Sequence, residues 1–135
     1  MNLVGKIVAT IALLLTAGVC AMAEEPHGLR GDLTEGKVAE VMVEFGDVKY
    51  SDTVSQTITF KNNTDTPIAL LDYEATCRCV WLDLPKRAIG VGEEGVVTIT
   101  YDSRGEWGSV GNYLSIETSN KSVKVAIWMS AEIVR

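Results

Sequence analysis

The chain has 135 residues, with 12 lysine or arginine residues against 18 aspartate or glutamate residues, so its formal net charge is −6 at pH 7. This length accommodates one domain around a single hydrophobic core and excludes two. The acidic balance repels phosphate backbones and anionic lipid surfaces, so we expect no nucleic acid among the partners.

The first 23 residues have the composition of a signal peptide. One positive charge, Lys6, precedes an apolar run, and small residues end the segment at Ala21-Met22-Ala23. A signal peptidase accepts only small side chains at the two alanine positions, so we expect cleavage after Ala23 and a mature chain that begins at Glu24. The protein is then exported to the periplasm, the cell surface or the medium.

Two other interpretations of this segment remain open. The uncharged stretch over residues 7–23 is slightly shorter than the roughly 20 residues that a spanning helix needs, which argues against an integral membrane span after processing. Cys20 follows the apolar run and is a candidate for lipidation. The bulky, β-branched Val19 ahead of it favours simple cleavage instead, because lipoprotein signals usually carry a small residue at that position.

Residues 24–37 are polar and glycine-rich, so we interpret them as a flexible lead-in. From residue 38 to residue 135, apolar and polar side chains alternate with the period of two that is typical of half-buried strands. Phe60 and Ile116 fall on the apolar phase and are expected in the core. The expected strands cover residues 41–45, 54–61, 68–75, 77–82, 96–102, 113–118 and 123–133.

Seven short strands with turn residues between them predict an all-β fold, an immunoglobulin-like two-sheet β-sandwich. The segment 62–67 reads Asn-Asn-Thr-Asp-Thr-Pro, a composition typical of a turn. No stretch has the helical period that the crossover connections of a parallel sheet require. We therefore expect one sandwich domain over residues 38–135.

Several short motifs are spread over nearly the whole mature chain: Phe45-Gly46, Phe60, Asn62, Thr76-Cys77-Arg78-Cys79, Tyr101-Asp102, Gly111 and Asn120. Together they resemble a secreted bacterial family, domain of unknown function 1573. The resemblance implies an immunoglobulin-type module related to the ASPM/SPD-2/Hydin group. It implies no enzymatic activity.

The residues themselves also argue against catalysis. The single histidine is His27, in the expected lead-in, whereas serine and cysteine hydrolases need a base beside the nucleophile. Glu93 and Glu94 are adjacent carboxylates between glycines, a pattern more typical of a solvated loop. Cys77 and Cys79 with scattered carboxylates make a weak metal signal. We expect no enzyme, no cofactor and no resident metal.

Cys77 and Cys79 are the thiols that remain after processing. Two residues along an extended strand place the Cα atoms about 6.6 Å apart, near the upper limit for a disulfide. Our hypothesis is a weak, reducible bridge that forms in an oxidising compartment. The alternative is two buried free thiols that pack as small apolar groups.

Two tryptophans are candidate binding residues, because such rings are enriched in recognition surfaces. Trp107 lies in a glycine-rich segment, and Trp128 alternates against the apolar set of the last strand; Trp81 is expected to pack in the core. The leading hypothesis is a non-enzymatic module that binds a protein or glycan of the cell envelope through loops or a sheet edge. The alternative is a thiol-redox or copper-binding protein that uses Cys77 and Cys79.

Overall fold

The computed structural model describes residues 29–135, which form eight β-strands and no helix. The strands are β1 Leu29–Leu33, β2 Val38–Lys49, β3 Thr53–Asn62, β4 Leu70–Ala75, β5 Val80–Asp83, β6 Glu94–Asp102, β7 Gly108–Thr118 and β8 Lys124–Val134. The expected cleavage site after Ala23 and the lipidation candidate Cys20 lie outside the described residues. Within the described part of the chain, no helix is long and apolar enough to cross a membrane.

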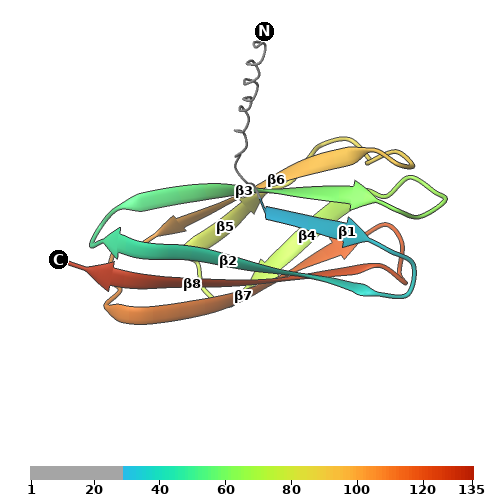
Figure 1. Cartoon of the computed structure of the whole chain (residues 1–135). Coiled ribbons are helices and arrows are strands. Elements are labelled where there is room, and N and C mark those ends of the chain that lie inside the picture. The colour runs from blue at the N-terminus through green and yellow to red at the C-terminus, as the bar shows by residue number, and fades with distance from the viewer. Residues whose placement is uncertain (1–28) are drawn as a thin grey trace, which may run out of the picture.

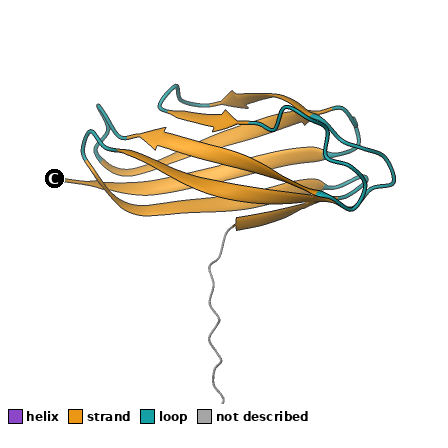
Figure 2. Cartoon of the chain, turned by 90° about the horizontal axis from the view of Figure 1, so that it is seen from above, coloured by secondary structure: helices purple, strands orange, loops and turns teal. Residues whose placement is uncertain are grey.

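The strands form two four-stranded sheets that pack face to face, as Figures 1 and 2 show. The order is β1-β3-β6-β5 in one sheet and β2-β8-β7-β4 in the other. This is the expected immunoglobulin-like sandwich. The pairings β1–β3 and β2–β8 are parallel, and the other four are antiparallel. The chain passes through the opposite sheet between β1 and β3, so their parallel pairing needs no crossover helix.

The core lies between the sheets and comes from the inward phase of each strand. In β2 every second side chain from Ala39 to Val43 is buried, while Glu40 and Met42 are exposed. Phe60 is fully buried and Ile116 is 4% exposed, so both core predictions are confirmed. Because each fully buried large apolar side chain contributes about 1.5–3 kcal/mol, these inward rows hold the two sheets together.

The expectation of a flexible lead-in is wrong for Leu29–Leu33, which forms β1. Leu33 is fully buried, and Leu29 packs against the core. Between them, Gly31 lies so close to the ring of Phe60 that an added Cβ would be 2.7 Å from a ring carbon. Glycine therefore allows β1 to approach β3, and the same glycine interrupts the apolar alternation by which a strand is recognised in a sequence.

Strand boundaries differ from the expectation in several places: β2, for example, covers residues 38–49 rather than 41–45, and two differences lie near the cysteine pair. β7 begins at Gly108 rather than Tyr113, because the glycine-rich segment ahead of Tyr113 pairs with β8. β5 begins at Val80 rather than Cys77, because Cys77–Cys79 lies in a turn between the two sheets. The second difference determines the geometry of the cysteine pair.

One buried side chain, Asn62, organises the turn after β3. Its Nδ2 donates to the carbonyl oxygens of Thr66 at 2.8 Å and Ile89 at 2.9 Å. Its Oδ1 accepts from the backbone N–H and the hydroxyl of Thr64, at 2.9 and 2.7 Å. Asn62 is fully buried, so these four hydrogen bonds fix the 62–67 turn against the connection between β5 and β6.

Candidate functional site

A disulfide joins Cys77 and Cys79 in the turn that leads from β4 in one sheet to β5 in the other. The turn brings the two Cα atoms to 5.2 Å, well inside the usual range for a disulfide. The expected extended strand would have held them further apart. The pair therefore lies at the open side of the sandwich, where the edge strands β4 and β5 face each other.

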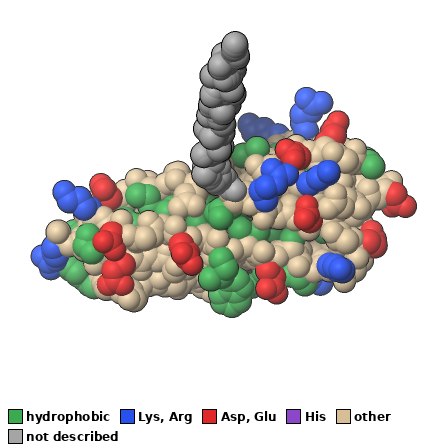
Figure 3. Space-filling view, viewed as in Figure 1, with side chains coloured by type: hydrophobic (Ala, Val, Ile, Leu, Met, Phe, Trp, Pro, Cys, Tyr) green, Lys and Arg blue, Asp and Glu red, His purple; other side chains and the backbone are tan. Residues whose placement is uncertain are grey.

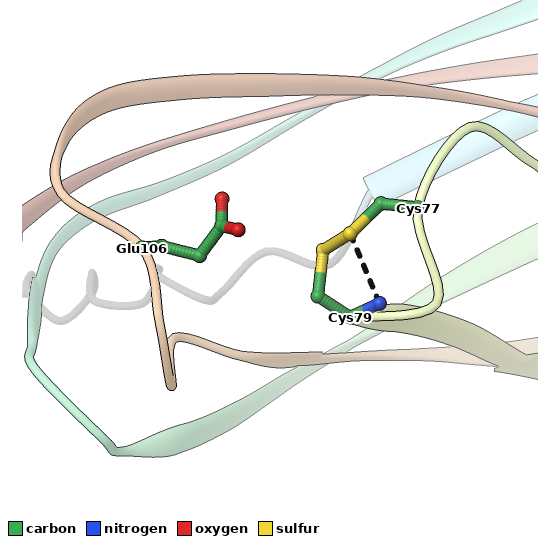
Figure 4. A group of neighbouring side chains, drawn as sticks. All are labelled: Cys77, Cys79 and Glu106. Atoms are coloured by element: carbon green, nitrogen blue, oxygen red, sulfur yellow. Dashed lines mark hydrogen bonds between the residues drawn. A yellow bond between two sulfur atoms is a disulfide. The ribbon is translucent and has the colours of Figure 1, made fainter.

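Polar groups from three directions approach the two sulfurs, and Figure 4 shows part of this arrangement. The backbone N–H of Cys79 donates to Sγ of Cys77 at 3.1 Å. Nδ2 of Asn112 lies 3.8 Å from Sγ of Cys79. A carboxylate oxygen of Glu106, in the connection between β6 and β7, lies within 4.8 Å of both sulfurs. We call Cys77, Cys79, Glu106 and Asn112 the disulfide corner.

Asn112 in β7 is held in place by Thr76, directly after β4, and by Met129 in β8. Its Oδ1 accepts from the hydroxyl of Thr76 at 2.9 Å, and the same hydroxyl accepts from the backbone N–H of Tyr113 at 3.1 Å. Its Nδ2 also contacts Sδ of the buried Met129 at 3.6 Å. These contacts direct the amide nitrogen, a donor, toward the Cys79 sulfur.

Tyr101 in β6 is the one buried side chain of the described region whose polar atom has no hydrogen-bond partner. Burial raises the pKa of Tyr101 to about 12, and the neighbouring carboxylates of Glu106 and Asp102 add to the shift. The phenol is therefore neutral over the whole physiological range. It adds a buried polar atom near Glu106 but carries no charge.

A surface groove lies between β4 and β5 and leads to the disulfide. Its lining consists of Asp72, Tyr73, Ala75, Cys77, Arg78, Val80 and Trp81. Trp81 is 36% exposed, so the expectation that it packs in the core is wrong. Its neighbours Val80 and Leu82 are the buried residues of β5, and the period of two places Trp81 on the opposite face.

If the disulfide were reduced, two thiolates and the Glu106 carboxylate would offer three ligands within 4.8 Å of one another. As a disulfide, the pair offers no thiolate to a metal ion. Sequence reasoning identified Cys77 and Cys79 but missed Glu106 and Asn112. No local motif marks those two residues: Asn112 reaches the sulfurs because β7 lies between β4 and β8, and Glu106 because it lies in the connection that leads from β6 to β7.

A second surface lies on the outer face of the β2-β8-β7-β4 sheet. Met42, Trp128 and Tyr113 stand opposite one another on β2, β8 and β7. Met42 is 58% exposed and Trp128 is 47% exposed, and the rings of Trp128 and Tyr113 lie 4.5 Å apart at a tilt of 54°. Figure 3 shows hydrophobic side chains gathered over β8 and β7, with acidic side chains on both sides. We call Met42, Trp128 and Tyr113 the apolar row.

Trp107, the other candidate binding residue, lies outside the apolar row and packs against side chains of this chain. Its ring stacks on Tyr50 with a centroid distance of 4.7 Å, and the guanidinium of Arg135 lies 4.1 Å from its centroid. The side chain is still 53% exposed. Trp107 precedes β7, whereas Trp128 pairs with Tyr113 well along that strand, so the structure does not bring the two tryptophans together.

Solved structures of several other proteins share the fold. A protein of unknown function from Porphyromonas gingivalis aligns with a TM-score of 0.59 and 16% identity, over 78% of this chain and 48% of that one. The ASH/PapD-like domain 7 of human CEP192 aligns with a TM-score of 0.57 and 8% identity, over 89% and 96%. The VesB protease of Vibrio cholerae aligns with a TM-score of 0.53 and 13% identity, over 76% and 32%.

These identities are low, so the likeness concerns the immunoglobulin-like fold alone. This chain spans about half the length of the Porphyromonas gingivalis protein. No curated protein matches the sequence significantly. The family model described as "Protein of unknown function (DUF1573)" matches residues 37–133, which is most of the chain and almost the whole sandwich, and the chain therefore belongs to this family.

Proposed function

We propose that this chain is a non-enzymatic, extracytoplasmic interaction module that binds another protein through the outer face of the β2-β8-β7-β4 sheet. The observation that carries the proposal is the apolar row, which places a tryptophan and a methionine in solvent at the middle of a sheet face. Contiguous exposed apolar side chains with a polar rim are typical of protein interaction surfaces.

The surroundings of the apolar row extend this surface. A groove on the same sheet is lined by Tyr113 and Ala126 and also by the exposed side chains of Val38 and Leu71. A partner that covered the row and the groove would bury these apolar side chains together with charged ones, such as Glu117 and Lys124, that also line the groove. Tryptophan is also the residue type in which binding energy is most often concentrated.

The chemistry of the rim indicates the kind of partner. Glu40 and Glu44 stand on the same face of β2, two residues on either side of Met42, and both are exposed. A partner with an apolar centre and basic residues around it complements this arrangement. The tilt between Trp128 and Tyr113 prevents one flat platform, which favours a protein over the stacked sugar rings of a glycan.

Two features support a site of action outside the cytoplasm. The first 23 residues have signal-peptide composition. The Cys77–Cys79 disulfide is a bond that persists in oxidising compartments. The proposal of a non-enzymatic role rests on the single histidine, His27, which leaves a hydrolytic nucleophile in the sandwich without the usual base.

The test is a pull-down of the exported chain from envelope extract, followed by affinity measurement with each captured protein. Trp128→Ala should weaken the specific complex at least tenfold, since a central tryptophan anchor typically contributes 2 kcal/mol or more. Val96→Ala is the matched control, because Val96 is also an exposed apolar residue but belongs to the other sheet. Binding that survives Trp128→Ala and Met42→Ala but is lost with Trp107→Ala would move the site to the loops.

A further inference from the structure

The disulfide corner has a chemistry that the proposed binding face does not use. A bridge between residues two apart closes a very small ring and restricts the unfolded chain little, so it contributes little to stability. Both cysteines are only partly buried, and a groove reaches the bridge from solvent. A bond that is accessible and of small structural value is suited to chemical exchange.

The two sulfurs have different surroundings. Cys77 lines the groove between β4 and β5, and Cys79 is not among the lining residues. On the other side, the amide of Asn112 approaches the Cys79 sulfur at 3.8 Å, and Figure 4 shows the Glu106 carboxylate on this side of the bridge. A nucleophile that enters by the groove therefore meets Cys77 first, with Cys79 behind it.

We infer that the Cys77–Cys79 disulfide is a thiol–disulfide exchange site, which accepts a cysteine thiolate from an extended segment of another protein at Cys77 and releases Cys79. The incoming sulfur bonds to Sγ of Cys77 while the Cys77–Cys79 bond breaks, and its electron pair leaves on Sγ of Cys79. The Cys79 thiolate then takes up one proton from water. A second thiol of the incoming segment then loses its proton and attacks the segment's first sulfur. A disulfide forms within the segment, the bond to Sγ of Cys77 breaks, and Cys77 leaves as a thiolate. The segment is thereby oxidised and the Cys77–Cys79 pair is reduced.

The neighbouring side chains have separate parts in this step. The Asn112 amide donates toward the sulfur on which negative charge develops, which eases its departure. The Glu106 carboxylate lies within 4.8 Å of both sulfurs, so its charge opposes a thiolate on either; it slows the departure of Cys79, and once Cys79 has taken up its proton it disfavours the return to the thiolate. Because a thiol is not the nucleophile, re-attack of Cys79 on the mixed disulfide slows.

The groove also indicates the class of substrate. Arg78 lies on its rim and attracts an anionic sulfur, while Asp72 on the same lining disfavours further negative charge. The rings of Tyr73 and Trp81 provide apolar walls for a narrow segment. A thiol on an extended, uncharged or basic stretch of polypeptide meets these conditions.

The test uses the oxidised, exported chain and reduced glutathione as the probe, with acid quenching and peptide mass spectrometry. We expect early mixed disulfide on Cys77 at least tenfold in excess over Cys79. Predominant attachment to Cys79, an equal division, or reaction only after denaturation would overturn the inference.

Single-cysteine variants give a second measurement that does not depend on the wild-type intermediate. With oxidised glutathione, Cys79→Ser, in which Cys77 is free, should react at least tenfold faster than Cys77→Ser, and equal rates would contradict the assignment. Glu106→Gln should shift re-closure of the mixed disulfide to lower pH, and Glu117→Gln, which changes an exposed carboxylate on β7, should not. An unchanged pH profile in Glu106→Gln would remove Glu106 from the mechanism. None of these outcomes depends on the partner of the apolar row.

Discussion

Replacing Asn62 by alanine tests how much the hydrogen bonds of this one buried side chain contribute to the stability of the fold. The substitution removes four hydrogen bonds, each with a net value of about 0.5–1.5 kcal/mol. The carbonyl of Ile89 keeps the N–H of Ile68 at 3.0 Å, and that of Thr66 keeps the Thr64 hydroxyl at 2.9 Å. We therefore expect the free energy of unfolding to fall by about 2–4 kcal/mol, the lower half of the range obtained by adding the four hydrogen bonds.

Urea unfolding and thermal melting measure this loss directly. For a domain of this size, about 2–4 kcal/mol corresponds to a fall in Tm of roughly 10–25 °C. Asn63→Ala is the control, because Asn63 is exposed and its contact with Leu33 is made by the backbone N–H. A fall of less than a few degrees in Asn62→Ala, or an equal fall in the control, would refute the assignment of the turn to the Asn62 side chain.

Four further predictions concern the core, the first strand, a buried phenol and processing. Phe60→Ala should lose about 3–5 kcal/mol and be unfolded or nearly so by circular dichroism, because a fully buried ring is removed. Gly31→Ala should lower the free energy of unfolding by about 1–3 kcal/mol through overlap with the Phe60 ring, whereas Gly111→Ala, whose new Cβ would meet nothing closer than 3.6 Å, should change it little. The pKa of Tyr101 is raised in the folded state from its ordinary value of 10.0 to about 12, so its contribution to stability is complete below pH 10 and is lost as pH rises toward 12; urea titrations should show this decline in the wild type and a smaller one in Tyr101→Phe. The intact mass of the exported protein should correspond to a chain that begins at Glu24, and a lipid-bearing species that begins at Cys20 would contradict this.

The alternation of apolar and polar residues was sufficient to predict most strands of the sandwich. Phe60 and Ile116 lie in the core, as the period of two predicts, because each strand has one face toward solvent and one face toward the core. β1 escaped the same reasoning because its central inward position is Gly31, where close approach to the Phe60 ring leaves no room for a side chain. The period also places Trp81 outward, so its exposure could have been predicted from Val80 and Leu82.

The candidate site was only half visible in the sequence. Cys77 and Cys79 are conspicuous as a pair in the sequence. Their turn and the Cα separation of 5.2 Å arise because the chain crosses here from one sheet to the other, and no local sequence pattern predicts that crossing. Asn112 reaches the sulfurs through strand pairing between distant parts of the chain, and Glu106 through the connection between β6 and β7. Contacts of this kind depend on topology, which periodicity does not specify.

The position of β8 between β2 and β7 has a consequence for folding during synthesis. A nascent chain that has emerged only as far as Thr118 lacks the neighbour of both strands, so this sheet cannot assemble on the ribosome before residues 124–134 have appeared. Pairing between strands so distant along the chain closes a long loop and is intrinsically slow. The other sheet, β1-β3-β6-β5, does not contain β8, so residues 124–134 decide when the second layer of the sandwich can close over it.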